Sequence, residues 1–334
     1  MPPHLRKAVK TLYDKLALAN SKNCNAAISI IIPTRNGADT LAELLAVLRL
    51  QTVQANEILV VDSSSTDETV EIATNFGAHV TVISKESFDH GGTRSSIAKL
   101  AKGEFLVFLT QDALPATKDS LFQLLSPLCS NSRAAVCYGR QLPKKDATWA
   151  AASLRSFNYP DQSSVRSFDD RSVHGLKTVF VSNSFAAYRK SALEEVGYFK
   201  NGLIFGEDTC TVGRLLEKGY VSIYASDAKV YHSHNYSWPE EFRRAFDTGV
   251  LHSTEQWLLD TYGKAEGVGL NFVRTQLSTL WQQKHITCMA DILCRSALKL
   301  AGYTSGRWHR RIPSKLIPHL SMHSDWWSYR NSGT

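Results

Sequence analysis

Two acidic positions far apart in the chain have the residue types that group transfer from a phosphorylated donor requires. Asp112 follows the apolar run 105–109, and Asp208 stands next to Glu207 further along. A carboxylate at the end of a strand can hold a divalent cation, which offsets charge on a leaving group. A second carboxylate can take the proton of an attacking hydroxyl. We therefore consider Asp112 a candidate metal ligand and Asp208 a candidate general base.

Each assignment has an ordinary structural alternative. An acid after a strand is often a turn former, and an acid in the first turn of a helix is favoured by the helix dipole. His232 and His234 close the strand-like segment 220–231 two residues apart, so they point to the same side. One of them could join Asp112 on Mg²⁺ or Mn²⁺, or both could form a polar rim without a metal.

The elements that would position these residues alternate along the first part of the chain. Predicted strands cover 28–32, 58–61, 80–83 and 105–109, and predicted helices cover 39–50, 67–75, 93–101 and 118–129. Such alternation favours an α/β fold with a mostly parallel sheet and helices on its faces. In open sheets of this kind, ligands bind beyond the carboxyl ends of the strands.

The second half of the chain is less regular. The polar stretch 141–175 is too long for a plain connection, so we expect a functional or mobile loop there. A strand at 178–181, a helix at 192–196, a helix at 208–218 and a strand at 220–231 follow. Beyond Pro239 the pattern is helical, with interruptions at 263–269 and 302–306. We divide the chain into a basic N-terminal extension (1–25), a catalytic α/β domain (26–238) and a C-terminal helical region (239–334).

Polar groups follow the first two strands where a nucleotide could bind. Thr34, Arg35 and Asn36 come after the first strand, and their side chains could bond a base edge or its ribose. Asp62 ends the second strand, where a carboxylate could accept the imide N–H of uracil or thymine. A helix N-cap is the alternative for such an acid. We assign base binding to Asp62 and capping to Asp67.

Arg94 and two polar segments complete the set of candidates. Gly91 and Gly92 would let the backbone approach a ligand closely, and Arg94 near a helix start suits phosphate or base contacts. The alternative is a tight loop with a surface arginine. Candidate acceptor-binding residues lie between the donor half and the base; they are Asn183, Ser184, Glu207 and Trp238. Trp238 could stack on a sugar ring or be a core residue.

The charge is concentrated at the two ends of the chain. The 334 residues carry a net charge of +7, with +4 in residues 1–25 and +7 in residues 270–334. The C-terminal stretch also holds Trp281, Trp308, Trp326 and Trp327. Basic residues interleaved with aromatics suit an anionic membrane surface, or they could cover an ordinary helical subdomain. Nucleic acid is disfavoured because no binding motif accompanies the charge.

No targeting or metal-cluster signal changes this interpretation. The N-terminus lacks the apolar core and cleavage site of a secretory signal, and no run approaches the ~18 apolar residues of a spanning helix. The six cysteines are scattered without paired metal-type spacing.

The ordered motifs resemble those of the inverting family 2 glycosyltransferases, which have the GT-A fold, a mixed sheet with helices on both faces. The matching segments are 28–36, 59–69, 91–103, 106–112 and 206–219. The resemblance implies nucleotide binding by Thr34, Asp62 and Arg94, Mg²⁺ or Mn²⁺ binding by Asp112, and deprotonation of the acceptor by Asp208. It also places Thr110 and Gln111 at the donor, although Thr110 departs from the usual D-x-D motif. Threonine there is compatible with a deoxyribose donor.

A narrower resemblance is to bacterial rhamnosyltransferases that build O-antigens and related polysaccharides. The segments that carry it are 88–94, 109–113 and 246–250. It implies dTDP-β-L-rhamnose as donor, a lipid-linked saccharide as acceptor, and a cytoplasmic location at the inner face of the cell membrane. The processive Q-x-x-R-W signature is absent, which favours addition of one or a few sugars.

Three other functions remain open from the sequence. A family 2 enzyme that uses a UDP-sugar, such as glucose, galactose or N-acetylglucosamine, would share every catalytic residue. A nucleotidyltransferase would need a Gly-rich, basic loop after the first strand, and residues 34–38 match that poorly. A non-catalytic nucleotide-binding protein is disfavoured by the intact Asp112 and Asp208.

Overall fold

The computed structural model describes residues 26–263, 266–282 and 286–331, so the predicted extension at 1–25 lies outside the described residues. Its strands are β1 (Ile28–Thr34), β2 (Glu57–Asp62), β3 (His79–Val82), β4 (Phe105–Leu109), β5 (Leu114–Pro115), β6 (Ala134–Leu142), β7 (Ser164–Arg166), β8 (Phe185–Arg189) and β9 (Val221–Tyr231). The helices of the first half are α2 (Ala38–Arg49), α3 (Thr69–Asn75), α4 (His90–Leu100), α5 (Ser120–Ser130), α6 (Trp149–Asn158) and α7 (Arg171–His174). Those of the second half are α8 (Lys190–Glu195), α9 (Glu207–Glu217), α10 (Trp238–Thr254), α11 (Gln256–Tyr262), α12 (Glu266–Gln282), α13 (Ile286–Arg307), α14 (Ile317–Leu320) and α15 (Ser324–Asn331).

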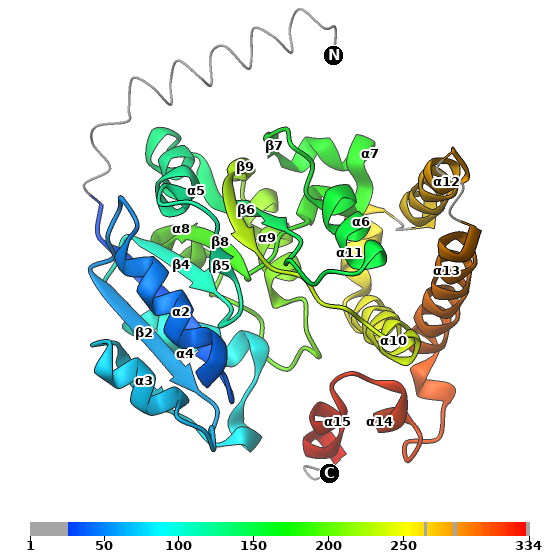
Figure 1. The fold of residues 1–334 in the computed structure, drawn as a ribbon, viewed down its shortest axis with the longest axis horizontal. Helices are drawn as coiled ribbons and strands as arrows, with labels where there is room; N and C mark the ends of the chain where they lie inside the picture. The colour runs from blue at the N-terminus through cyan, green and yellow to red at the C-terminus, as the bar shows by residue number, and fades with distance from the viewer. Residues whose placement is uncertain (1–25, 264–265, 283–285, 332–334) are drawn as a thin grey trace, which may run out of the picture.

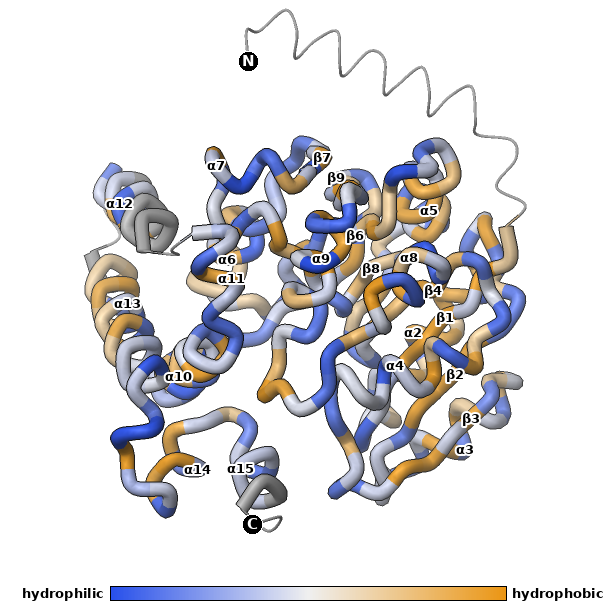
Figure 2. The backbone as a smooth tube through the Cα atoms, turned by 180° about the vertical axis from the view of Figure 1, so that it is seen from behind, coloured by the Kyte–Doolittle hydropathy of each residue, from blue (hydrophilic) through white to orange (hydrophobic). Residues whose placement is uncertain are grey.

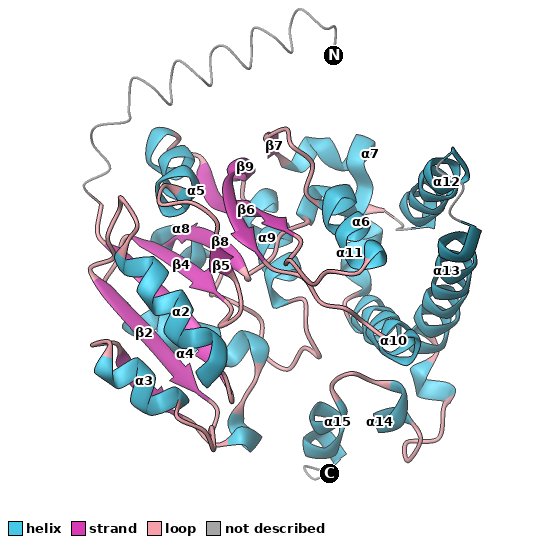
Figure 3. Cartoon of the chain, in the orientation of Figure 1, coloured by secondary structure: helices cyan, strands magenta, loops and turns pink. Residues whose placement is uncertain are grey.

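The strands form one mixed sheet in the order β3-β2-β1-β4-β8-β6-β9-β5, with β7 also paired to β9 (Figure 3). The first four strands in this order are parallel, as the alternating pattern predicts. The antiparallel strand β8 then joins them to β6 and β9, which are parallel to each other. The carboxyl ends of β1, β2 and β4 therefore share one edge, where the candidate donor residues follow.

The alternation of side chains along β1 and β4 builds a separate apolar core on each face of the sheet. Ile30 and Ile32 of β1 pack with Val107 of β4 against α2 and α5. Ile31 and Phe108 point to the other face and pack against α4, α8, α9 and α10. Both faces are thus covered by helices, which is why these strands read as continuous apolar runs.

Some predicted elements were wrong, and packing explains each case. Residues 178–181 are not a strand, because a 3₁₀ helix (Gly175–Val179) occupies this stretch and the strand begins only at Phe185. Thr178 and Val179 are fully buried, so their apolar pattern reports burial and not extended backbone. The stretch 141–175 is not an open loop, because it contains α6, β7 and α7. The central strand β6 was missed.

The C-terminal region packs two long helices, α10 and α13, directly against each other. The predicted interruption at 302–306 is wrong, because α13 runs through it to Arg307. A Cβ on Gly302 would lie 2.3 Å from the Phe242 carbonyl oxygen, and one on Gly306 would lie 2.0 Å from that of Phe246. These glycines therefore serve close helix packing. No helix in the described ranges combines the length and apolarity that crossing a bilayer requires.

After α13 the chain turns back toward the α/β domain. Figure 1 shows α14 and α15 (red) below α10, at the end of the molecule where the loop after β3 also lies. Lys85 of that loop forms an ion pair of 2.8 Å with Asp325 of α15. The last described residues thus reach the edge of the sheet that carries the candidate donor residues.

Close packing of α10 on α13 predicts a strong effect of Gly306→Ala. The added methyl group would meet the backbone of α10, so we expect a loss of about 1–3 kcal/mol of stability, the usual cost of overpacking. Thermal unfolding measures it. Ala301→Leu, which adds volume at an exposed position of the same helix, is the control and should unfold near the wild-type temperature. An unchanged melting temperature for Gly306→Ala would contradict the packing argument.

Candidate active site

The loops after β1, β2 and β4 are tied together by side chains from the predicted donor set. Asp62 is fully buried and accepts hydrogen bonds from the Thr34 hydroxyl (3.0 Å) and the Ser65 amide (2.8 Å). Gln111 accepts from the Arg35 amide (2.9 Å) and donates to the Arg35 carbonyl (3.1 Å). These contacts fix the loop backbone, so the donor edge is preformed.

Asn36 has a different local role. It adopts a left-handed backbone conformation with φ of 44°. Its side-chain oxygen accepts from the Thr66 backbone amide at 2.9 Å, while its backbone amide donates to the Ser65 hydroxyl. Asn36 therefore joins the first loop to the second. Asp62 lies beneath these loops and does not line the cavity described next, so its contact with a base stays a prediction.

A cavity of about 710 Å³ opens at this edge of the sheet. Its lining includes Thr34, Arg35, Arg94, Thr110 and Gln111, five residues predicted for donor binding. Within the described part of the chain, the buried Thr110 hydroxyl oxygen and the Arg94 Nε have no hydrogen-bond partner. Buried polar atoms normally find one. Unpaired groups at a cavity wall are what a polar ligand would satisfy.

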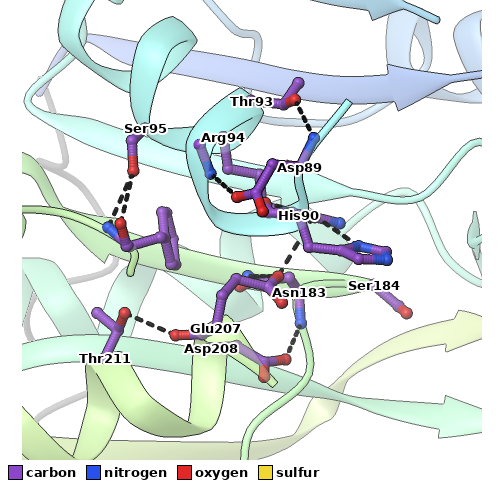
Figure 4. Close-up of polar contacts among 12 residues, drawn as sticks. Asp89, His90, Thr93, Arg94, Ser95, Asn183, Ser184, Glu207, Asp208 and Thr211 are labelled. Atoms are coloured by element: carbon purple, nitrogen blue, oxygen red, sulfur yellow. Dashed lines mark hydrogen bonds and ion pairs between the residues drawn. The ribbon is translucent and has the colours of Figure 1, made fainter. Parts of the chain in front are cut away.

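Arg94 connects this cavity to the acidic pair through a buried ion pair (Figure 4). Its guanidinium lies 3.3 Å from the Glu207 carboxylate, and both side chains are less than a tenth exposed. Asn183 donates to the same Glu207 oxygen at 3.1 Å and accepts from the Tyr188 hydroxyl at 2.8 Å. Burial opposes ionisation of Glu207, but the charge of Arg94 lowers its pKa below the usual value.

Asp208 is next to this pair, and no ion pair joins it to a cation within the described residues. Its carboxylate accepts from the Asn183 amide at 3.2 Å and from the Thr209 amide at 2.7 Å. Burial, followed by repulsion from the Glu207 charge, raises the pKa of Asp208 to about 6. The side chain is still partly exposed. A partly accessible carboxylate with a pKa near neutrality fits a general base.

Asp112, His232 and His234 come together as predicted. One potential ligand atom from each lies within 4.8 Å of the other two. The His232 Nδ1 contacts the Gln141 side-chain oxygen at 3.0 Å, which leaves Nε2 facing Asp112 at 3.5 Å. Such outer contacts commonly orient a metal-binding imidazole. Carboxylate and imidazole ligands suit Mn²⁺ and related ions, so the residues fit a divalent cation.

Lys144 is a partner of Asp112 that the sequence interpretation missed. Its ammonium lies 3.3 Å from the Asp112 carboxylate. Burial opposes ionisation of Asp112, yet hydrogen bonding to His232 and the charges of His232 and Lys144 hold its pKa well below the usual range. Asp112 is thus ionised, as a cation ligand must be.

Two predicted acceptor residues lie differently. Ser184 is close to the donor edge, since its carbonyl accepts from the Thr110 amide at 3.4 Å. Trp238 begins α10 and donates from its indole nitrogen to Asp291 of α13 at 2.7 Å. Trp238 is therefore held against α13 and does not line the cavity.

Part of the cavity wall comes from residues that the sequence did not suggest for it. His90 and the C-terminal residues 322–326 line the cavity together with the predicted donor residues. Nothing in the composition of the C-terminal region points to this position, because its basic and aromatic residues suited a membrane surface equally well.

Comparison with known proteins identifies the kind of enzyme that has these features. The model of glycosyl transferase family 2 matches residues 29–197. The chain is 38% identical over 90% of its length to the O-antigen chain rhamnosyltransferase WbaN of Salmonella anatum, of which it covers 96%. It is likewise 38% identical to the O-antigen chain rhamnosyltransferase RfbN of Salmonella typhimurium, with the same shares covered.

Solved structures agree on the fold. A mannosyltransferase from Pyrobaculum calidifontis, determined with GDP-mannose and Mn²⁺, superposes with a TM-score of 0.59 at 17% identity, covering 90% of this chain and 95% of its own. Residues 1–349 of TarS from S. aureus, determined with UDP-GlcNAc, superpose with a TM-score of 0.52 at 19% identity, covering 91% and 89%. These structures confirm the predicted GT-A fold. The family match and the two relatives set aside the nucleotidyltransferase and binding-protein alternatives.

Proposed function

The chain belongs to glycosyl transferase family 2, and on that premise we propose that it transfers L-rhamnose from dTDP-β-L-rhamnose to a hydroxyl of a lipid-linked saccharide during O-antigen-like polysaccharide synthesis. The observation that carries the donor sugar is the 38% identity, over nine-tenths of the chain, to two proteins named O-antigen chain rhamnosyltransferases. The cavity edge supports a nucleotide donor, because Thr110 and Arg94 present unpaired polar atoms there.

The proposed reaction is a single displacement at the anomeric carbon. Asp208 takes the proton of the acceptor hydroxyl while the oxygen forms its bond to that carbon from the face opposite the nucleotide. The bond between the anomeric carbon and the diphosphate oxygen breaks, its electrons leave with dTDP, and a β-linked donor becomes an α-rhamnoside. A divalent cation held by Asp112, with His232 or His234, would offset the charge of the departing diphosphate.

Donor identity is tested by thermal stabilisation of the purified protein with dTDP, dTDP-rhamnose, UDP and UDP-sugars, each with and without Mn²⁺. A ligand at about 100 times its Kd adds about 2.7 kcal/mol, which shifts the melting temperature measurably. We expect selective stabilisation by the dTDP compounds that Mn²⁺ enhances in the wild type but not in Asp112→Asn. His79→Asn, at an exposed position on β3, is the control. Preference for UDP-sugars would overturn the rhamnose assignment.

The raised pKa of Asp208 predicts the pH dependence of transfer. Only the ionised carboxylate can accept a proton, so the rate should fall about tenfold per pH unit below pH 6 and level off above it. Glu207→Gln removes one of the charges that raise this pKa, so the acid limb should move to lower pH. Asp208→Asn should lose about 10²–10⁴-fold in turnover.

Initial rates between pH 4.5 and 8 measure both effects, with donor binding and thermal unfolding recorded for each variant. Near-normal turnover by a folded, donor-binding Asp208→Asn would rule out the base assignment. An acid limb that stays at the same pH in folded Glu207→Gln would show that Asp208 does not set it.

We further propose that the enzyme docks on an anionic bilayer, where a lipid-linked acceptor resides, through the outer face of α13. Leu293 and Leu300 of α13, and Trp308 directly after it, are each more than half exposed, and Figure 2 shows hydrophobic positions along this helix. Arg310 and Arg311 follow and are exposed, and the Arg311 guanidinium lies 4.0 Å from the Trp308 ring centre. Basic groups beside exposed apolar side chains are complementary to an anionic membrane surface.

Co-sedimentation with vesicles of phosphatidylglycerol and phosphatidylcholine tests this surface. The double variant Leu293→Glu with Leu300→Glu should lose most of the vesicle-bound fraction, and binding of the wild type should weaken with salt. Leu50→Glu, at an exposed leucine after α2, should bind as the wild type does. Equal sedimentation of the double variant would contradict the proposed surface.

A further inference from the structure

Asp247 of α10 is a buried carboxylate that the proposed reaction does not use. It is fully buried, and it has no ion-pair partner within the described ranges. Burial raises its pKa to about 6, even though it accepts hydrogen bonds from the Ser321 hydroxyl (2.6 Å) and the Met322 amide (3.0 Å). Burying a carboxylate is costly. The hydrogen bonds of this one hold the chain in place at residues 321 and 322.

The chain held in this way forms a wall of the donor cavity. We call residues 321–326 the C-terminal hook. Its residues 322–326 line the cavity together with Thr34, Arg94 and Thr110. Asp325 pairs with Lys85 of the loop after β3, which also lines the cavity. The cavity wall therefore joins a loop of the α/β domain to the last described residues of the chain.

His323 is the hook residue best placed to meet a ligand. Its ring lies edge-on to His90, with centroids 5.2 Å apart, and parallel to Phe205 at 6.3 Å. Its ring nitrogens form no hydrogen bond within the part of the chain that is described. Burial and then the neighbouring His90 lower the pKa of His323 to about 3. The neutral ring keeps one donor and one acceptor nitrogen, both available to a polar ligand.

The same helix explains how the end of the chain reaches this place. Gly249, two residues after Asp247, lets α13 approach closely, since a Cβ there would lie 2.2 Å from the Tyr303 carbonyl oxygen. The segment 246–250 thus docks α13 and holds the hook. In the sequence, residues 246–250 were notable only for their resemblance to rhamnosyltransferases. In the structure they pack against α13 and hold the hook in place.

We propose that the hook is part of the donor site: His323 contacts the nucleoside diphosphate of the donor, and Asp247 is the residue that positions it. The proposal rests on the proposed function only in that the ligand is a nucleotide donor. Asp247 touches no substrate, so it acts through the hook. Lys85, now paired with the exposed Asp325, is a second group on the cavity wall that a diphosphate would attract.

Fluorescence titration with dTDP, and with UDP and GDP in parallel, tests the proposal. Trp326 lines the cavity, so nucleotide should change the emission of the wild type, and Trp326→Phe should lose most of that change. His323→Ala and Asp247→Ala should each raise the Kd at least tenfold. Asp247→Asn should be milder, because its amide oxygen can still accept from Met322. The matched control is His319→Ala, at an exposed histidine of α14 just before the hook, which should keep the wild-type Kd.

Two further readouts separate positioning from general damage. Asp247→Ala should expose the C-terminal segment to limited proteolysis, whereas His323→Ala should not. In transfer assays, Asp247→Ala and His323→Ala should each raise KM for the donor while KM for the acceptor stays unchanged. If Asp247→Ala fails to fold, His323→Ala and Trp326→Phe still decide the matter.

The outcomes distinguish the hook from the proposed function. Binding of UDP in place of dTDP, with the same losses in the variants, would overturn the rhamnose assignment and support the hook. Wild-type Kd for His323→Ala, with the fluorescence change kept in Trp326→Phe, would overturn the hook and leave the function standing. No binding of any nucleotide by the wild type would overturn both.

Discussion

The buried ion pair between Arg94 and Glu207 is the interaction on which the rest of the site depends. Arg94 comes from α4, between the parallel strands β3 and β4, and Glu207 begins α9, between β8 and β9. Removing one partner of a buried pair typically costs 3–5 kcal/mol, because the other charge is left uncompensated. The pair therefore holds the start of α4 and the start of α9 in one relative position, which the proposed in-line displacement between two bound substrates requires.

The same ion pair gives the two adjacent carboxylates different pKa values. Glu207 faces Arg94 and Asn183 and keeps its charge, whereas Asp208 accepts from the backbone amides of Asn183 and Thr209 and from the Thr209 hydroxyl, and it feels the charge of Glu207. The environment thus pushes their pKa values apart, the usual way in which neighbouring acids take structural and catalytic roles. An arginine that bonded both acids equally would hold both ionised and leave a weaker base.

The sequence predicted those elements whose signal lies within their own residues, and it failed where packing against distant segments decides the structure. The strands at β1, β2 and β4 were predicted because their continuous apolar runs are buried on both faces, and the polar residues after them gathered at one edge as expected. The predictions that were wrong concerned residues whose conformation depends on tertiary packing. Thr178 and Val179 are buried as a 3₁₀ turn, and Gly302 and Gly306 lie inside a helix because another helix needs the space. Composition cannot separate a glycine that breaks a helix from one that lets a neighbour approach.

The C-terminal aromatics show the same limit at a functional site. Trp308 is more than half exposed, but Trp327 is buried in the core that α10 helps to form. One stretch of sequence thus supplies an outer surface and a wall of the donor cavity. Asp247 separates the two, because this fully buried carboxylate accepts hydrogen bonds from Ser321 and Met322 and so holds the chain after α14 in place. Its neighbours in sequence indicate a helix, and only its burial shows that the helix also anchors the end of the chain.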